Sequence, residues 1–568
     1  MLKALFHYFL ILKSGLFDRG YYLLTNPDVR KADVDALWHF VRLGWKEGRN
    51  PSHFFDISFY LDNNPDVRQI DINPLIHYIR HGKNEGRYPN PVRKLGKGYF
   101  DFELIQQERE PNMPVYTDAY LQTFPINQDD DTVMEDFRLS IPEMDEGEIS
   151  KIISDDVPQY DEKVSIIIPT KNAGKEFNFL LKMLTNQKGF KEIEIVIVDS
   201  GSTDNTLEIA KSYNAKIVEI LPEEFSHSFA RNLGAKNATG DYFLFTVQDA
   251  LPPTKTWLNK LMTTIKTEDV IVASCAELPR EDADLFYRVK SWNHYKFLEV
   301  NQKDRILSMP ADPNHINLRK NGQISDLACL ISAKLFLKYK YRLSYAEDLD
   351  LGIRLIKDGK RIAFLGTMRI IHSHNRPAFY LIKRGYVDNL FLSDIFSDFV
   401  IPEVYFQNVA QDIAFTYNFF NTQICEEITQ LDYPVNILTL ESTIKQQLHS
   451  ADTFAYPKKE DIKANHYING EILAFIDSLL DISGYAKVGN NYDGTLIKGL
   501  LGFINMTFEY LKGSHDLVDK HLAEEIKYCI FKEISILSGG NLAYSYINGL
   551  EKEKDTMHPI HSYLRESV

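Results

Sequence analysis

The chain has 568 residues, more than one hydrophobic core holds, so we expect about two to four domains. Its formal net charge of −15 disfavours a nucleic-acid-binding surface, and no nucleic-acid partner is expected. The four cysteines have no CxxC spacing, which disfavours a structural zinc site and predicts small core residues in a reducing compartment. No apolar run reaches the roughly 20 residues that span a bilayer, so an integral membrane protein is not expected.

The first residues, MLKALFHYFLILKSGLF, contain a short apolar stretch that Lys3, His7 and Lys13 interrupt. They lack the small-residue cleavage site of a signal peptide. The pattern predicts either a packed first helix or an amphipathic helix at a membrane surface.

Residues 17–91 contain an internal repeat with a constant offset of 38 residues, as from Phe17 to Phe55. NPDV, a histidine and EGR recur at the same offset, which indicates one supersecondary unit used twice. Each copy predicts a short helix that ends at Asn-Pro and a second helix that a glycine closes. His39 and His77 lie on apolar helix faces, where a core or interface role is expected before a functional one. We therefore expect a helical region over residues 1–95.

Residues 96–162 are irregular and acidic, with QDDDTVMEDF and IPEMDEGE among them, and predict a linker with short packed elements. From Val164 onward, apolar strands such as VSIIIPT, EIEIVIVD and FLFTVQDA alternate with helical segments such as FNFLLKMLTNQ. This alternation predicts an α/β domain over residues 163–400, with a mostly parallel sheet covered on both faces. Neither GxGxxG after the first strand nor GxxxxGK[ST] occurs, so a dinucleotide site and a P-loop are not expected. Four segments with apolar faces at helical spacing predict a helical C-terminal domain over residues 401–568.

Two predicted strands end in a carboxylate. Asp199 closes IEIVIV before the polar turn SGSTDNT, and Asp249 closes FLFTVQ before Pro252-Pro253. Because α/β sheets bind ligands at the carboxyl ends of their strands, Asp199 is a candidate for contact with a nucleotide base and Asp249 for binding Mg²⁺ or Mn²⁺. Each also fits a structural role, an N-cap for Asp199 and a turn residue for Asp249.

Two further groups are candidates for chemistry. Glu347-Asp348 begins a predicted amphipathic helix, where a carboxylate either complements the helix dipole or serves as a general base for a hydroxyl. His372 and His374 follow the strand IAFLGTMRII as HSH, and both point to one side if the strand persists. One metal ligand with a hydrogen-bonding neighbour is a simpler expectation than two ligands.

The order VSIIIPTKN, IVIVDSGSTDNT, FSHSFARNLGAKNATGDYFLF, VQDALPP, YAEDLDLGIRL and IIHSHN resembles the family 2 glycosyltransferases of GT-A fold, in particular their bacterial rhamnosyltransferase-like branch. The resemblance covers about Lys163 to Val400. The N-terminal repeat resembles a short module found beside bacterial glycosyltransferase domains. The implied fold class is an α/β GT-A (Rossmann-like nucleotide-diphospho-sugar transferase) core, with an α-helical N-terminal repeat region and an α-helical C-terminal domain.

The resemblance assigns roles to individual residues. It implies that Asp348 is the catalytic base, beside Glu347, and that Asp249 is the second carboxylate of a DxD metal motif. His372 matches the late histidine that completes the metal shell, with His374 as its fallback. The donor-binding residues that it implies are Pro169, Thr170, Asp199, Ser200, Gly201, Asp204, His227, Arg231, Asn232 and Gln248. Val247 stands where the family has the first acid of DxD, and Ser200 where it often has a second acid after Asp199, so weaker metal binding is expected.

The implied reaction is a single inverting displacement, with Mg²⁺ or Mn²⁺ as cofactor, from a nucleotide-sugar donor to an oligosaccharide or lipid-linked glycan acceptor. The product would be a bacterial surface polysaccharide (O-antigen, capsule or cell-wall glycan), and the subgroup implies dTDP-L-rhamnose as donor. Alternatives are UDP-hexose, UDP-N-acetylhexosamine or UDP-galactofuranose as donor, a noncatalytic carbohydrate-binding or scaffold protein, or a protein whose N-terminal repeats are the functional part. The presence of both Asp249 and Asp348 favours the enzyme. A cytoplasmic location is expected, with peripheral contact at the inner face of the cytoplasmic membrane left open.

Overall fold

The computed structural model describes most of residues 22–89, residues 157–451, 470–483 and 494–565 apart from a few single positions, and scattered residues before position 22. Most of the first predicted helix and the predicted acidic linker up to position 156 lie outside the described residues. The chain divides into two compact units, one of residues 1–107, 376–390 and 401–568, the other of residues 108–375 and 391–400. The domain boundaries given above stay predictions.

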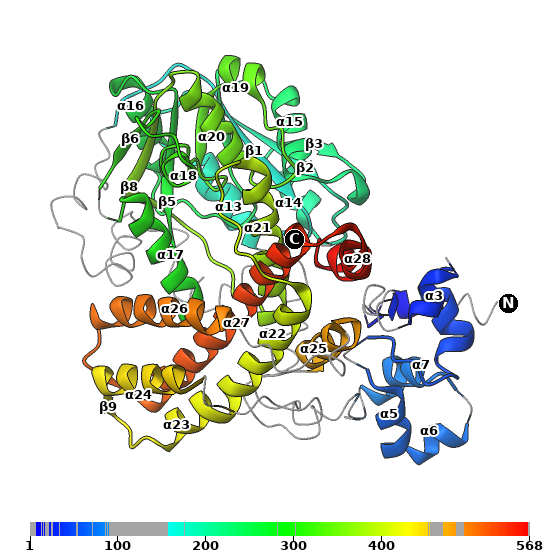
Figure 1. Ribbon diagram of the computed structural model, residues 1–568. Coiled ribbons are helices and arrows are strands. Elements are labelled where there is room, and N and C mark those ends of the chain that lie inside the picture. Colours follow the sequence, from blue (N-terminus) through cyan, green and yellow to red (C-terminus); the bar gives the residue numbers. More distant parts are fainter. Residues whose placement is uncertain are drawn as a thin grey trace. The chain divides into compact units, whose positions relative to one another are not determined.

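The second unit is built on an eight-stranded sheet (Figure 1). In spatial order its strands are β3 (Lys216–Glu219), β2 (Ile193–Asp199), β1 (Val164–Thr170), β4 (Tyr242–Phe245), β7 (Cys329–Ser332), β5 (Val272–Leu278), β8 (Ile362–Ile371) and β6 (Arg305–Leu307). The first four are parallel, as are β5 and β8, whereas β7 is antiparallel to β4 and β5, and β6 to β8. The expectation of a mostly parallel sheet is therefore confirmed, because β5 and β8 run in the same direction as the first four strands and only β7 and β6 of these eight run the opposite way. A short apolar run does not reveal the direction in which a buried strand is paired.

Both faces of this sheet are buried by helices, as predicted. Because successive side chains of a strand point to opposite faces, Val164, Ile166 and Ile168 of β1 belong to one apolar core and Ile167 to another. The first core includes residues of α13 (Glu176–Thr185), α14 (Thr206–Ser212) and α16 (Trp257–Thr267). The second includes residues of α15 (His227–Asn237), α17 (Leu285–Leu298), α18 (His315–Asn321), α19 (Ala333–Tyr339) and α20 (Glu347–Lys357). A short 3₁₀ turn, η3 (Pro222–Glu224), precedes α15.

The strand expected to end at Asp249 is shorter than predicted. β4 ends at Phe245, where its pairing with Ile167 of β1 stops, so Asp249 lies in the following loop and not at the strand tip. The loop returns to the sheet at Leu251, which exchanges two backbone hydrogen bonds of 2.9 Å with Ile371 at the end of β8. These bonds bring Asp249 towards the residues that follow β8.

In the first unit, the two sequence repeats make the same contacts. The first copy has α3 (Pro27–Lys31), α4 (Ala36–His39) and η1 (Phe40–Gly44), and the second has α5 (Ile57–Asn63), α6 (Pro65–Gln69), α7 (Pro74–His77) and η2 (Tyr78–Gly82). Tyr22 and His39 are joined by a 3.0 Å hydrogen bond, and Tyr60 and His77 by an equivalent one. Both histidines are thus partners of core tyrosines, as expected.

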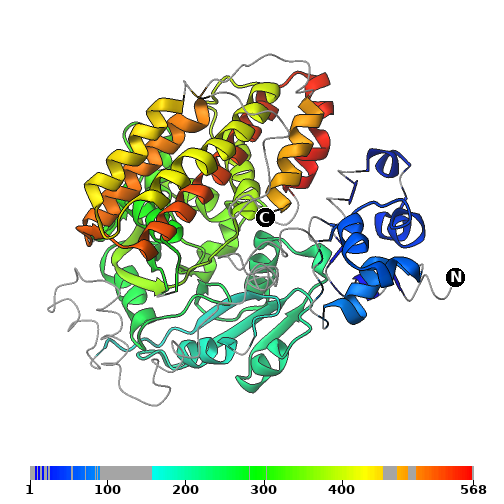
Figure 2. The same cartoon turned by 90° about the horizontal axis from the view of Figure 1, so that it is seen from below.

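The described residues in the rest of the first unit are mainly helical. Its helices are α21 (Ala378–Ile395, which runs into the second unit), α22 (Phe406–Phe419), η4 (Phe420–Ile424), α23 (Cys425–Gln430), α24 (Ile437–Ser450), α25 (Gly470–Ser483), α26 (Thr495–Lys512), α27 (Lys520–Asn548) and α28 (Glu551–Arg565). β9 (Val435–Asn436) pairs with β10 (Leu517–Val518). Figure 2 shows α22, α26 and α27 packed side by side. The predicted α/β core and helical C-terminal region are confirmed.

Two expectations about composition can also be compared with the fold. All four cysteines are buried, as predicted. Among the residues that the structure describes, no helix has both the length and the hydropathy that crossing a bilayer requires.

Candidate active site

Three loops meet at the carboxyl ends of β1, β2 and β4. Gln248 ties the third loop to the first, because its Oε1 accepts the backbone N–H of Lys171 at 2.8 Å and its Nε2 donates to the Lys171 carbonyl at 3.3 Å. Asp204 ties the second loop to the first, because its Oδ2 accepts the backbone N–H of Gly174 at 2.9 Å. The residues predicted for the donor from these strands therefore share one edge of the sheet.

Asp199 is buried and organises the turn that follows β2. Its Oδ1 accepts the hydroxyl of Thr170 at 3.0 Å and that of Ser202 at 2.5 Å, while its Oδ2 accepts the N–H groups of Gly201 and Ser202 at 3.0 and 2.8 Å. Gly201 has a φ of 88°, which favours glycine in this turn. Four hydrogen bonds fill the acceptor positions of a carboxylate. These contacts are those of a turn-forming residue, and contact with a nucleotide base stays a prediction.

Pro169 and Ser200 lie beside Asp199. Pro169 is on β1 opposite Val198, and the Ser200 hydroxyl donates to the Thr170 carbonyl at 3.2 Å. Both therefore help to form this edge of the sheet, and their contact with a donor stays a prediction.

The three residues predicted on α15 have different surroundings. His227 is half-buried, with its ring 5.2 Å from that of Phe225. Asn232 holds the backbone of Tyr341 through two hydrogen bonds, of 2.9 Å to its carbonyl and 3.1 Å from its N–H. Arg231 is fully buried. Of these three predicted donor-binding residues, His227 and Asn232 are partly exposed and Arg231 is not.

Arg231 is the centre of a cluster of carboxylates. One of its terminal nitrogens lies 2.5 Å from Oε1 of Glu347, and the other lies 3.0 Å from Oδ2 of Asp326. Burial opposes the charge of the guanidinium, but the charges of Glu347 and Asp326 keep its pKa above the ordinary value. Because a buried charge needs such partners, we assign Arg231 and Glu347 to holding the start of α20 in place.

Asp348 occupies the first turn of α20 and is half-buried. Its Oδ1 accepts the backbone N–H of Leu349 at 2.7 Å. Burial, together with the charges of Asp326 and Glu347, raises the pKa of Asp348 to about 8. A carboxylate with a raised pKa is a stronger proton acceptor than an ordinary aspartate, which suits a general base.

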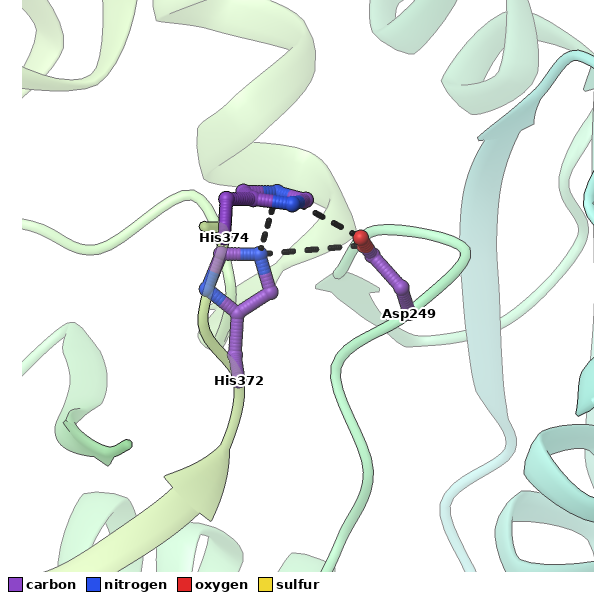
Figure 3. Close-up of side chains that lie close together, drawn as sticks. All are labelled: Asp249, His372 and His374. Carbon is purple, nitrogen blue, oxygen red and sulfur yellow. Dashed lines mark hydrogen bonds and ion pairs between the residues drawn. The ribbon is translucent and has the colours of Figure 1, made fainter. Parts of the chain in front are cut away.

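The second cluster consists of Asp249, His372 and His374, which converge on one point (Figure 3). The two imidazole Nε2 atoms are 3.0 Å apart. Nε2 of His372 lies 3.8 Å from Oδ1 of Asp249, and Nε2 of His374 lies 3.4 Å from Oδ2. β8 ends at Ile371, so the histidines meet through the turn after the strand and not through strand alternation.

These three residues fit a divalent cation. Metal–nitrogen bonds of about 2.1 Å with a right angle between them separate two ligand atoms by about 3.0 Å. The Nε2 separation matches that value, and the carboxylate oxygens lie at distances that wider angles give. The sequence left His374 as a fallback, whereas the geometry brings both imidazoles and the carboxylate to the same point.

The sequence interpretation missed Glu277, Tyr287 and Asp326. Glu277 Oε2 lies 3.2 Å from Nδ1 of His372, and the Tyr287 hydroxyl donates to the same Oε2 at 2.9 Å. Burial lowers the pKa of His372, but the charge of Asp249 and the bond to Glu277, with a smaller contribution from Asp326, raise it overall. Glu277 lies near the end of an apolar strand and Asp326 lies in a loop. No local sequence pattern indicates that Glu277 contacts His372 or that Asp326 contacts Arg231.

The two clusters are close enough to interact electrostatically. Burial raises the pKa of Asp348 and the charge of Asp326 adds to that rise. Burial lowers the pKa of His372, and Asp326 adds a smaller upward contribution to those of Asp249 and Glu277. The Thr246 hydroxyl, in the loop that carries Asp249, donates to the carbonyl of Leu327, next to Asp326, at 2.8 Å. The fold and the site thus define an α/β protein of the GT-A class. In it, three residues suited to a metal ion lie near a carboxylate whose pKa is raised.

Comparison with known proteins gives the family. Residues 165–321 match the model of glycosyl transferase family 2. The O-antigen chain rhamnosyltransferase WbaN of Salmonella anatum is 27% identical over 220 residues, which cover 37% of this chain and 66% of that protein. The O-antigen chain rhamnosyltransferase RfbN of Salmonella typhimurium is 26% identical over 220 residues, which cover 38% of this chain and 67% of that protein.

Among solved structures, a mannosyltransferase of Pyrobaculum calidifontis in complex with GDP-Man and Mn²⁺ matches with 14% identity and a TM-score of 0.30, over 73% of this chain and 91% of that one.

The chain contains a family 2 glycosyltransferase domain. The matched segment spans about two thirds of the length of the two rhamnosyltransferases. The predictions of the family and of a transferase are confirmed.

Proposed function

We propose that this protein is an inverting glycosyltransferase that moves a sugar from a nucleotide-sugar donor to a growing bacterial surface polysaccharide. The observation that supports this most is that Asp348, a carboxylate with a raised pKa, lies near the cluster of Asp249, His372 and His374. An inverting transfer needs these two capacities, a base for the acceptor and positive charge for the leaving group.

Asp348 is the base in this proposal. Its ionised carboxylate accepts the proton of an acceptor hydroxyl as that oxygen attacks the anomeric carbon, and the nucleoside diphosphate departs from the opposite face. Arg231 binds Glu347, which precedes Asp348 on α20, and so fixes where the base stands. Glu347 then acts on the reaction through its neighbour.

Asp249, His372 and His374 would hold the divalent cation, which when bound supplies charge to the departing diphosphate. Two imidazoles suit Mn²⁺ better than Mg²⁺, because Mg²⁺ prefers oxygen ligands. We therefore favour Mn²⁺ of the two cofactors predicted. The imidazoles also offset the carboxylate that is missing at Val247.

The donor that we propose is dTDP-L-rhamnose, because two relatives are named as rhamnosyltransferases of the O-antigen chain. The other donors stated above are the alternatives that a screen must include. For the acceptor we propose an oligosaccharide or lipid-linked glycan at the inner face of the cytoplasmic membrane.

A thermal-stabilisation screen tests the proposal. The protein is heated with dTDP-L-rhamnose, UDP-glucose, UDP-N-acetylglucosamine and UDP-galactofuranose, each with and without Mn²⁺, and the Asp249→Asn variant serves as control. We expect stabilisation by dTDP-L-rhamnose that depends on Mn²⁺ and is lost in Asp249→Asn. Stabilisation by a UDP-sugar instead would overturn the donor, and no stabilisation by any nucleotide would support a noncatalytic protein.

A further inference from the structure

His372 is held from behind by residues of two other elements. Its Nδ1, the ring nitrogen that does not face Asp249, lies 3.2 Å from Oε2 of Glu277 in β5. The hydroxyl of Tyr287 in α17 lies 3.4 Å from the same Nδ1. The side chains of His372 and Glu277 are only 9% and 14% exposed, so water competes little for this contact.

Glu277 is itself fixed by one face of α17. The Tyr287 hydroxyl donates to its Oε2 at 2.9 Å, and the Ser291 hydroxyl donates to its Oε1 at 3.0 Å. The backbone N–H of Glu277 donates to the Tyr295 hydroxyl at 2.7 Å. Residues 287, 291 and 295 are four positions apart and therefore lie on one side of the helix. Burial and the charge of Glu277 raise the pKa of Tyr287 far above its ordinary value, so its hydroxyl keeps the proton that it donates.

The segment that carries the two histidines is anchored to the start of α17. Asn375 accepts the backbone N–H of Asp284 at 2.9 Å and donates to the carbonyl of Asp282 at 2.8 Å. Ser373, between the histidines, accepts the backbone N–H of Arg280 at 3.2 Å. The position of α17 and that of His372 are thus set together.

We propose that Glu277 is a positioning residue for the metal centre, which accepts the Nδ1–H of His372 and so leaves the Nε2 lone pair directed at the point shared with Asp249 and His374. This inference rests on the proposed function, since it assumes that the three residues bind a cation. A carboxylate behind a ligating imidazole fixes its tautomer and ring orientation and makes it a stronger ligand. Loss of such a partner weakens metal affinity by about 10–100-fold.

Four proteins test the inference: wild type, Glu277→Gln, Tyr287→Phe and the control Glu268→Gln. Glu268 is an exposed glutamate of the same unit at the end of α16. The affinity for Mn²⁺ is measured on metal-free protein without donor, by the electron paramagnetic resonance signal of free Mn²⁺. We expect a loss of about tenfold or more in Glu277→Gln, a smaller loss in Tyr287→Phe and none in Glu268→Gln. Tyr287→Phe keeps the ring that packs here, so the inference stays testable if Glu277→Gln fails to fold.

A second measurement separates positioning from a general structural role. Nitrogen NMR of ¹⁵N-histidine-labelled, metal-free protein reports which nitrogen of His372 carries the proton, and the His372→Asn variant assigns its signals. We expect Nδ1–H in the wild type and a shift of the proton towards Nε2 in Glu277→Gln. If Glu277→Gln keeps the wild-type tautomer of His372, or binds Mn²⁺ with an affinity within twofold of wild type, the role of Glu277 is overturned while the proposed function stays intact. Failure of the wild type itself to bind Mn²⁺ would instead count against the metal site of the proposed function.

Discussion

Replacing Arg231 with methionine would remove the buried positive charge between two carboxylates. The side chain of Arg231 is 0% exposed and that of Glu347 is 6% exposed, so water cannot take over the role of the guanidinium. Breaking such a buried pair costs about 3–5 kcal/mol of unfolding free energy. Asp326 is 38% exposed, and its share of that cost is about 1 kcal/mol or less.

Urea unfolding followed by tryptophan fluorescence measures this cost. The control is Arg361→Met, because Arg361 pairs with Asp269 at the surface, where the two side chains are 44% and 97% exposed. We expect a loss of about 0–1 kcal/mol in that control. Adding Glu347→Gln to Arg231→Met removes the stranded negative charge and should recover part of the stability.

The result that would refute this reasoning is a loss of about 1 kcal/mol or less in Arg231→Met. A variant that folds with unchanged stability but no longer binds a nucleotide would show that Arg231 contacts the donor, as the family resemblance implied. Equal losses in the buried and the surface variant would show that burial does not determine the cost.

Three further outcomes are expected. The transfer rate should fall about tenfold for each pH unit below about 8, because the raised pKa of Asp348 leaves less of the ionised base, and a profile that is flat from pH 6 to 9 would exclude Asp348 as that base. Asp348→Asn should be more stable than wild type at pH 9 and little different at pH 4, which thermal unfolding at both pH values would reveal. Because the pKa of Asp348 is raised in the folded protein, the carboxyl stays protonated there while that of the unfolded chain ionises. The stabilising contribution of Asp348 is therefore present below its ordinary pKa and is lost as pH rises towards 8. Gly234→Val should lower the unfolding free energy by about 1–3 kcal/mol, since a Cβ on Gly234 would lie 2.4 Å from Cγ2 of Ile167, and unchanged urea unfolding would show that α15 moves away from β1 at no cost.

Local sequence patterns were enough to predict the first half of the core. The strands at Val164–Thr170 and Ile193–Asp199 follow the predicted runs because β-branched residues buried on both faces leave few other structures. Asp249 illustrates where such patterns fail. The apolar run FLFTVQ continues past the strand, and the strand ends where hydrogen bonding to β1 ends, which depends on a neighbour distant in sequence.

Contacts between distant residues were not predictable. Glu277 and His372 are 95 positions apart, and Arg231 and Glu347 are 116 apart, so no spacing rule connects them. The four C-terminal segments predicted as helical are residues 408–431, 471–485, 495–513 and 521–537, and they do not include α24 or α28. α27 continues through Gly539 and Gly540. Gly539 lets it approach α21 closely, since an added Cβ would lie 1.9 Å from the carbonyl oxygen of Ile382.

The separate roles of Asp249 in donor binding and of Asp348 in proton transfer can be measured directly. Isothermal titration of wild type, Asp249→Asn and Asp348→Asn with dTDP-L-rhamnose and Mn²⁺ gives donor affinity, and release of dTDP in the presence of acceptor gives transfer. We predict that Asp348→Asn binds the donor within about threefold of wild type but releases no dTDP, whereas Asp249→Asn loses affinity for the donor with Mn²⁺. Transfer by Asp348→Asn at the wild-type rate, or a loss of donor binding in that variant as large as in Asp249→Asn, would contradict the assignment of Asp348 as the base.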